Sequence, residues 1–101
     1  MDEMIIFGLI TASGNAKSDA MEAIQHAKAG DIVAARQAIK NAEESLKEAH
    51  KTQTSLIQSE ASGKKVEMSI LLVHAQDHLM NAILMKDLAA EFVDLYEQVK
   101  S

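Results

Sequence analysis

Apolar residues recur along the chain at alternating spacings of three and four, the pattern of helices that bury one face. The pattern breaks at two glycines, Gly30 and Gly63. A glycine just past the last turn is a common helix end because it adopts positive φ without strain. The chain has no proline and is rich in the strong helix formers Ala, Leu, Lys, Glu and Gln. We therefore predict three helices, near residues 2–29, 32–61 and 66–99.

The two expected connections are short, which makes consecutive helices antiparallel neighbours. At the first, Lys28 lies in the last turn of one helix and Asp31 is placed to cap the next. At the second, Glu67 is expected in the first turn of the third helix. The sequence thus predicts an all-α fold: a single helical domain over residues 1–101, forming an antiparallel three-helix bundle that runs up, down and up.

Each helix has one face that we expect to be buried, and the many alanines on it imply close helix approach. Gly8 and Gly14 lie inside the first helix, where we expect a closely packed neighbour to explain them, with a kink in the helix as the alternative. The expected buried positions are Ile5, Leu9, Ala12, Ala16, Ala20, Ala23 and Ala27 in the first helix, Ile32, Ala35, Ile39, Ala42, Leu46, Ala49, Gln53 and Leu56 in the second, and Met68, Leu72, Ala75, Leu79 and Ala82 in the third.

The third helix carries a second, rotated stripe, which a lone three-helix bundle does not need. A helix with two apolar faces requires a partner to cover the second one. The simplest inference is that the chain associates with itself through this helix. The stripe consists of Ile70, Val73, Asp77, Met80 and Leu84.

Four polar residues gather in one place on this apolar helix: His74, Gln76, Asp77 and His78. His74 lies three residues before Asp77 and four before His78, so these side chains can be neighbours on the helix surface. Placing two imidazoles and a carboxylate there costs stability unless they are paired or used. Asp77 also interrupts the second apolar stripe, as register-setting polar residues do in coiled coils. The cluster is the candidate functional site.

Three kinds of chemistry use such histidines. Histidines at i and i+4 can bind zinc, but Ala75 stands where the metalloprotease pattern has glutamate, and no third ligand is evident. General acid–base catalysis needs a substrate pocket, for which a slim bundle poor in aromatic residues offers little room. Covalent catalysis needs a nucleophilic nitrogen, an orienting neighbour and an apolar rim that excludes water from a labile P–N bond, and the surroundings of His74 offer these. We assign no role to His26 and His50.

The charge balance excludes several other functions. Ten basic and fifteen acidic residues give a net charge of −5, which argues against nucleic-acid binding. The absence of cysteine excludes disulfides and suits a reducing compartment. No signal peptide is evident and no apolar stretch is long enough to span a membrane, so we expect a cytoplasmic protein without membrane insertion.

The segment from Val66 to Leu88, with the core VHAQDHLM, resembles the IIA component of the lactose, cellobiose and diacetylchitobiose branch of the bacterial phosphotransferase system. The resemblance extends over almost the whole chain. It includes GNAKS at residues 14–18, where the family usually has arginine in place of Lys17. It also includes GD at residues 30–31, EAHKTQT at residues 48–54 and QSEA at residues 58–61.

The resemblance implies that His74 is phosphorylated by the phosphocarrier HPr and passes the phosphoryl group to a cysteine of the IIB component, during uptake of a β-linked disaccharide. It implies a homotrimer in which Asp77 of each subunit binds one shared Mg²⁺ ion. Gln76 and His78 would lie near the phosphoryl group, with His78 as an orienting neighbour. Lys17 would be a departure that does not touch the site. The alternative is a non-catalytic helical adaptor that binds a partner through the apolar face of the third helix.

Overall fold

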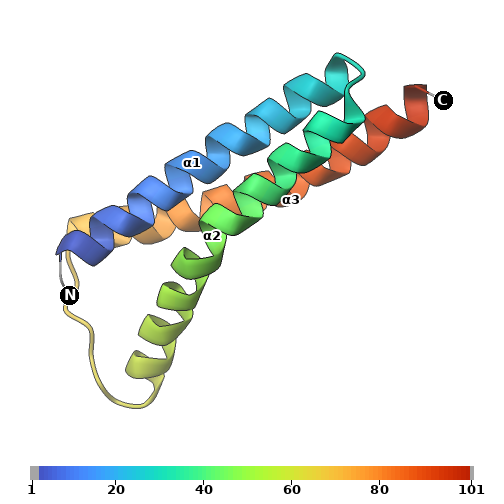
Figure 1. The fold of residues 1–101 in the computed structure, drawn as a ribbon. Helices are drawn as coiled ribbons and strands as arrows, with labels where there is room; N and C mark the ends of the chain where they lie inside the picture. The colour runs from blue at the N-terminus through green and yellow to red at the C-terminus, as the bar shows by residue number, and fades with distance from the viewer. Residues whose placement is uncertain (1–2, 101) are drawn as a thin grey trace.

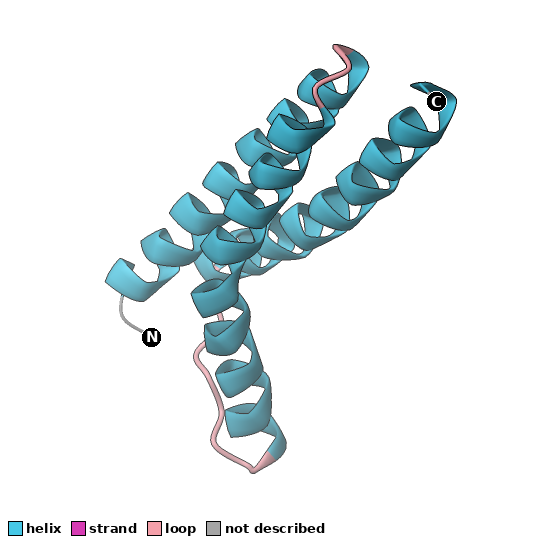
Figure 2. Ribbon diagram, turned by 45° about the vertical axis from the view of Figure 1, so that its right-hand side comes forward, coloured by secondary structure: helices cyan, strands magenta, loops and turns pink. Residues whose placement is uncertain are grey.

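The computed structural model describes residues 3–100, which form three helices joined by two connections. The helices are α1 (Glu3–Lys28), α2 (Ile32–Ala61) and α3 (Ile70–Lys100). Figure 1 shows α2 returning beside α1 and α3 running back in the direction of α1, so the antiparallel up-down-up bundle predicted from the sequence is confirmed. The described part is elongated, measuring 53 × 22 × 18 Å. Figure 2 shows a tight first connection and a longer second one.

The two glycines end their helices as the sequence predicts. Gly30 and Gly63 have φ values of 87° and 94°, a region that L side chains rarely adopt. The backbone N–H of Gly30 donates to the carbonyl of Ala27 at 3.0 Å, and the next N–H donates to the carbonyl of His26 at 2.9 Å. The same two-bond pattern closes α2 around Gly63. Both pairs satisfy carbonyl groups that a helix end otherwise leaves without partners.

The third helix begins later than expected, at Ile70 rather than near residue 66. Ser69 sets this start, because its side-chain oxygen accepts the backbone N–H of Leu72 at 3.0 Å, as an N-cap residue does. Glu67 therefore precedes the helix and does not lie in its first turn. The predicted N-cap of α2 is present: Asp31 Oδ1 accepts the backbone N–H of Ala34 at 3.0 Å.

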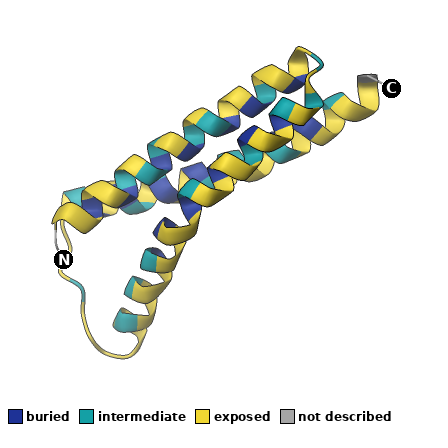
Figure 3. Ribbon diagram, viewed as in Figure 1, coloured by how far each residue is buried: buried dark blue, intermediate teal, exposed yellow. Residues whose placement is uncertain are grey.

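The core runs along the line where the three helices lie together, as the buried positions in Figure 3 show. It is built largely from alanine, which permits close helix approach, and its largest fully buried side chains are Leu79 and Val93. Two clusters make it up. One contains Ile6, Leu9, Ala16, Ala42, Leu46, Ala49, Leu72, Ala75, Leu79 and Ala82, and the other contains Ala23, Ala27, Ala35, Ala38 and Val93.

Two of the expected buried positions, Ile5 and Met68, are exposed, and four others are only partly buried: Ala12, Ile32, Ile39 and Leu56. In α1 the core position is taken by Ile6, while Ile5 is exposed and Ala12 only partly buried. Met68 is exposed because it lies before the first turn of α3. A close neighbour does not explain Gly8, since a Cβ atom built there would meet nothing within 4 Å.

The second apolar stripe of α3 lies on the surface of the single chain. Ile70 is 90% exposed, and Val73, Met80 and Leu84 are all more than half exposed. The C-terminal part of α2 leads away from the other two helices and is largely exposed (Figures 1 and 3). The single chain therefore leaves apolar surface that its own helices do not cover.

Candidate functional site

The four polar residues expected to form a site lie on successive turns of α3, but their burial differs. His74 and Asp77 are exposed, whereas Gln76 and His78 are half-buried. The buried residues Ala75 and Leu79 lie on the core face of the same turns. The apolar rim expected to shield His74 from water is not formed within one chain, because Val73 and Met80 are also exposed.

The imidazole rings of His74 and His78 are stacked. Their centroids are 5.9 Å apart and the ring planes make an angle of 15°. This is the arrangement that i, i+4 spacing favours, since both side chains leave the helix in the same direction one turn apart. At this distance a group bonded to one ring can reach the other ring.

Lys17 of α1 holds the second of these rings. Its ammonium nitrogen Nζ lies 2.6 Å from Nδ1 of His78. A lysine ammonium can only donate, so Nδ1 of His78 accepts and the neutral ring carries its proton on Nε2. The expectation that position 17 does not touch the site is therefore wrong. The contact joins residues separated by 61 positions, so no local pattern could have revealed it.

The surroundings of His78 favour its neutral form. Burial lowers the pKa of His78 from its usual value, and the positive charge of Lys17 and the neighbouring His74 lower it further, while Asp77 acts in the opposite direction. His78 is thus kept as a neutral hydrogen-bond donor next to His74.

Gln76 is oriented by a buried partner from α2. The side-chain N–H of Gln53 donates to Oε1 of Gln76 at 2.8 Å. Gln53 is only 8% exposed, so this bond fixes the amide of Gln76 with its oxygen toward the core. With its oxygen accepting from Gln53, the amide nitrogen of Gln76 has two N–H groups that can donate to another partner. The apolar spacing of α2 predicts that Gln53 is buried, but it gives no sign of the contact with Gln76.

The described residues of one chain contain no complete set of metal ligands. Among residues 3–100, no group of three or more His, Cys, Asp or Glu side chains is arranged to hold a metal ion. The zinc interpretation of His74 and His78 therefore has no third ligand in the described residues. Asp77, exposed on the second apolar stripe, supplies one carboxylate.

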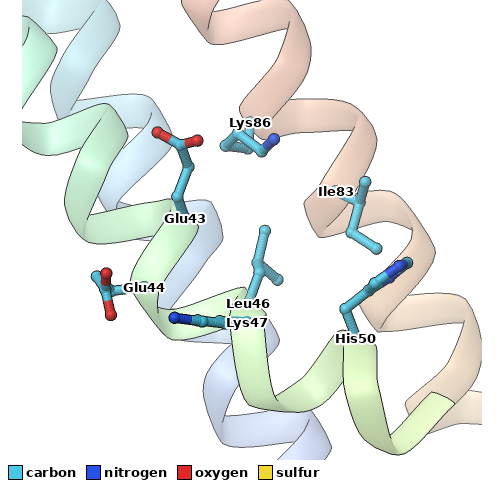
Figure 4. A pocket seen from close by; sticks show the side chains of 7 residues that line it. All are labelled: Glu43, Glu44, Leu46, Lys47, His50, Ile83 and Lys86. Carbon is cyan, nitrogen blue, oxygen red and sulfur yellow. The ribbon is translucent and has the colours of Figure 1, made fainter. Parts of the chain in front are cut away.

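Two surface hollows lie between α2 and α3. The hollow in Figure 4, of about 400 Å³, receives Leu46 and His50 from α2 and Ile83 and Lys86 from α3. None of the four candidate site residues lines it. The other hollow, of about 420 Å³, borders the site. Its lining is Leu56, Ile57, Glu60, Val66, Met68, Leu72, Val73, Gln76, Asp77 and Met80.

No helix in the described part of the chain is both long and apolar enough to cross a bilayer.

Comparison with known proteins identifies the class to which this fold and site belong. The model of the family described as "PTS system, Lactose/Cellobiose specific IIA subunit" matches residues 4–97. The lichenan-specific phosphotransferase enzyme IIA component of Bacillus subtilis (strain 168) is 56% identical over 97 residues, covering 96% of this chain and 88% of that protein.

Two solved structures are closely similar. The cellobiose-specific enzyme IIA from Bacillus anthracis superposes with a TM-score of 0.90 at 58% identity, covering 99% of this chain and 94% of that one. The IIA component in the solution structure of the Escherichia coli IIA(chitobiose)–HPr complex gives a TM-score of 0.83 at 41% identity, covering 98% and 96%.

The chain belongs to the lactose/cellobiose-specific IIA family of the phosphotransferase system. It is the IIA component of a sugar-specific system, and such components are phosphoryl carriers with a transferase role.

Proposed function

We propose that His74 is the residue that carries the phosphoryl group, accepting it from phospho-HPr and passing it to a cysteine of the cognate IIB component. The observation that carries this proposal is the pairing of an exposed imidazole, His74, with a stacked neutral imidazole, His78, that α1 holds in place. An exposed ring can meet the donor and the acceptor in turn, and its fixed neighbour can orient the group that it carries.

Both transfers are substitutions at phosphorus. On charging, an imidazole nitrogen of His74 uses its lone pair to form a P–N bond, and the bond from phosphorus to the donor breaks, with its electron pair returning to the donor. On discharge, the cysteine thiolate of the IIB component attacks phosphorus and the P–N bond breaks, with its electron pair returning to the imidazole. The solved complex of a 41% identical IIA component with HPr supports HPr as the donor.

Gln76 and His78 serve as donors to the bound group. A phosphoryl group adds about −1.5 to −2 charge near neutral pH, and charge-assisted hydrogen bonds to it are the strong ones. Gln76 has its oxygen engaged by Gln53, and Nδ1 of His78 is engaged by Lys17. With these acceptor atoms occupied, Gln76 and His78 can present N–H donors to the phosphoryl group.

The exposed stripe of α3 supports assembly as a homotrimer. Three copies that packed Ile70, Val73, Met80 and Leu84 around a common axis would bury the apolar surface that one chain leaves exposed. The apolar rim that His74 lacks in the single chain would then come from neighbouring subunits.

Asp77 suits a Mg²⁺ site only in such an assembly. One chain offers a single carboxylate there, but three copies on an axis bring three hard oxygen ligands together, the donor type that Mg²⁺ prefers. The ion, one per trimer, would supply positive charge that offsets the repulsion and desolvation of the three Asp77 side chains.

The test is charging by phospho-HPr labelled in its phosphoryl group, followed by addition of the IIB component. We expect one label per chain, released on addition of IIB, and no labelling of His74→Gln. His50→Gln is the matched control, since His50 lies in the hollow of Figure 4 and should be labelled like the parent. His78→Ala should charge more slowly while its label stays on His74.

A non-catalytic adaptor is the second candidate, favoured by the exposed apolar stripe of α3 alone. An adaptor would bind a partner without acquiring label. Labelling at the same level in the parent and in His74→Gln would contradict the proposed role of His74.

The sugar is not encoded in this chain, since the carrier need not contact it. The relatives compared above are named for lichenan, cellobiose and chitobiose. A β-linked disaccharide and a cytoplasmic location remain predictions.

A further inference from the structure

Two residues of α1 contact or face the two ring nitrogens of His78. Lys17 Nζ lies 2.6 Å from Nδ1. At the other ring nitrogen, a Cβ atom built on Gly14 would lie 3.8 Å from Nε2. Gly14 and Lys17 are three residues apart and so share one face of α1. One face of α1 therefore lies close to both ring nitrogens of His78, which belongs to α3.

The lysine decides which nitrogen of His78 carries the proton. Because an ammonium group has donors and no acceptor, Nδ1 must accept and Nε2 must carry the hydrogen. The ring centroids of His78 and His74 are 5.9 Å apart, a separation that a phosphoryl group on His74 can bridge to the Nε2–H of His78.

The absence of a side chain at Gly14 leaves space next to Nε2 of His78. Any side chain at position 14 would begin at ordinary contact distance from this nitrogen. Glycine inside a helix is unfavourable relative to alanine, so its presence at position 14 calls for a reason. Space for an oxygen atom next to Nε2–H is such a reason, whereas Gly8 in the same helix faces open space.

We propose that Lys17 and Gly14 are positioning residues for phosphoryl transfer: Lys17 fixes His78 with its proton on Nε2, and Gly14 leaves room for a phosphoryl oxygen of phospho-His74 to accept that proton in a hydrogen bond. This inference rests on the proposed phosphorylation of His74. The competing view is that the lysine contact only ties α1 to α3 and that the glycine is incidental.

The first experiment measures the ring of His78 and the rate of transfer in lysine variants. The ¹⁵N shifts of the unphosphorylated parent should show Nε2–H and an unprotonated Nδ1. Lys17→Met should mix the two tautomers and slow charging by phospho-HPr about 10- to 100-fold, the range expected for a lost hydrogen bond to a charged group. Lys17→Arg retains a donor and should restore both readouts. Lys28→Met, a distant exposed lysine of the same helix, should change neither.

The second experiment uses the two glycines of α1 as a matched pair. Gly8→Ala and Gly14→Ala should both raise the melting temperature, because alanine favours helix. Only Gly14→Ala should slow charging, since its methyl group occupies the place of the oxygen. This combination of higher stability and slower transfer is not what a merely structural glycine gives.

Three results would overturn the inference: a parent His78 protonated on Nδ1, a Lys17→Met variant that charges at the parental rate, or equal charging of the two glycine variants. The tautomer measurement needs no phosphoryl donor. A wrong tautomer therefore overturns the inference and leaves the role of His74 intact, while label absent from His74 overturns both.

Discussion

Replacing Leu84 with serine tests whether the exposed stripe of α3 is an interface between copies of the chain. Leu84 is 58% exposed in the single chain, so more than half of its surface is available for a partner to cover. The same exposure means that the substitution removes little from the core of the monomer. The helix should therefore form as before, and the effect should fall on assembly.

The size of the effect follows from the exposed fraction. Burying a whole leucine side chain contributes roughly 1.5–3 kcal/mol, so covering the exposed part of Leu84 contributes about 0.9–1.7 kcal/mol per chain. Three chains lose about 3–5 kcal/mol together, which weakens the trimer dissociation constant by roughly 10²- to 10⁴-fold.

Sedimentation equilibrium over a range of protein concentrations measures this shift directly. The matched control is Val33→Ser, which removes an apolar side chain of α2 that is 84% exposed and should leave assembly unchanged. A circular-dichroism melt at low concentration checks that the Leu84→Ser monomer is still helical. Equal association of Leu84→Ser and the parent, or a parent that is monomeric at every concentration, would refute an interface along this stripe.

Three further substitutions probe the metal, the core and the charge on α1. Asp77→Leu should remain trimeric and melt no lower than the parent, because well-packed apolar residues often replace a buried ionic cluster without loss of stability. Its melting temperature should not change when a chelator is added. A monomeric variant would show instead that the metal is required for assembly. Leu79→Ala should lower the free energy of unfolding by about 2–5 kcal/mol, since Leu79 is fully buried, and a loss below about 1 kcal/mol in urea melts would contradict this packing. Asp19→Asn should stabilise the chain at pH 7, because burial and the nearby Glu22 raise the pKa of Asp19 and its charged form is therefore unfavourable in the fold. This gain in stability should disappear as the pH falls through the range in which carboxyl groups protonate. A gain that persists in acid would disprove the electrostatic cause.

The helix ends show why part of the fold could be predicted from local sequence. Gly30 and Gly63 require positive φ, and a glycine after a periodic segment carries that information in itself. Ser69 carries a comparable signal as an N-cap, but the acidic Glu67 also suits a first turn, and the start of α3 predicted from it is too early. Ile5 and Ile6 are both apolar, so periodicity alone could not decide which of them faces the core.

The candidate site also has one part that local sequence predicts and one part that it does not. The i, i+4 spacing predicts that His74 and His78 are neighbours on one helix, and the structure adds that their rings are stacked. The contact between Lys17 and His78 depends on how α1 and α3 are placed along and around each other. That placement results from the packing of many small side chains, so the sequence around any one residue does not predict it.

The most direct test of the central claim is to find the residue that carries the phosphoryl group. The chain is charged with phospho-HPr, digested under alkaline conditions that preserve the P–N bond, and its peptides are sequenced by fragmentation in a mass spectrometer. All of the phosphoryl group should be found on His74. Finding it on His78, on His50 or on a serine would contradict the proposed role of His74.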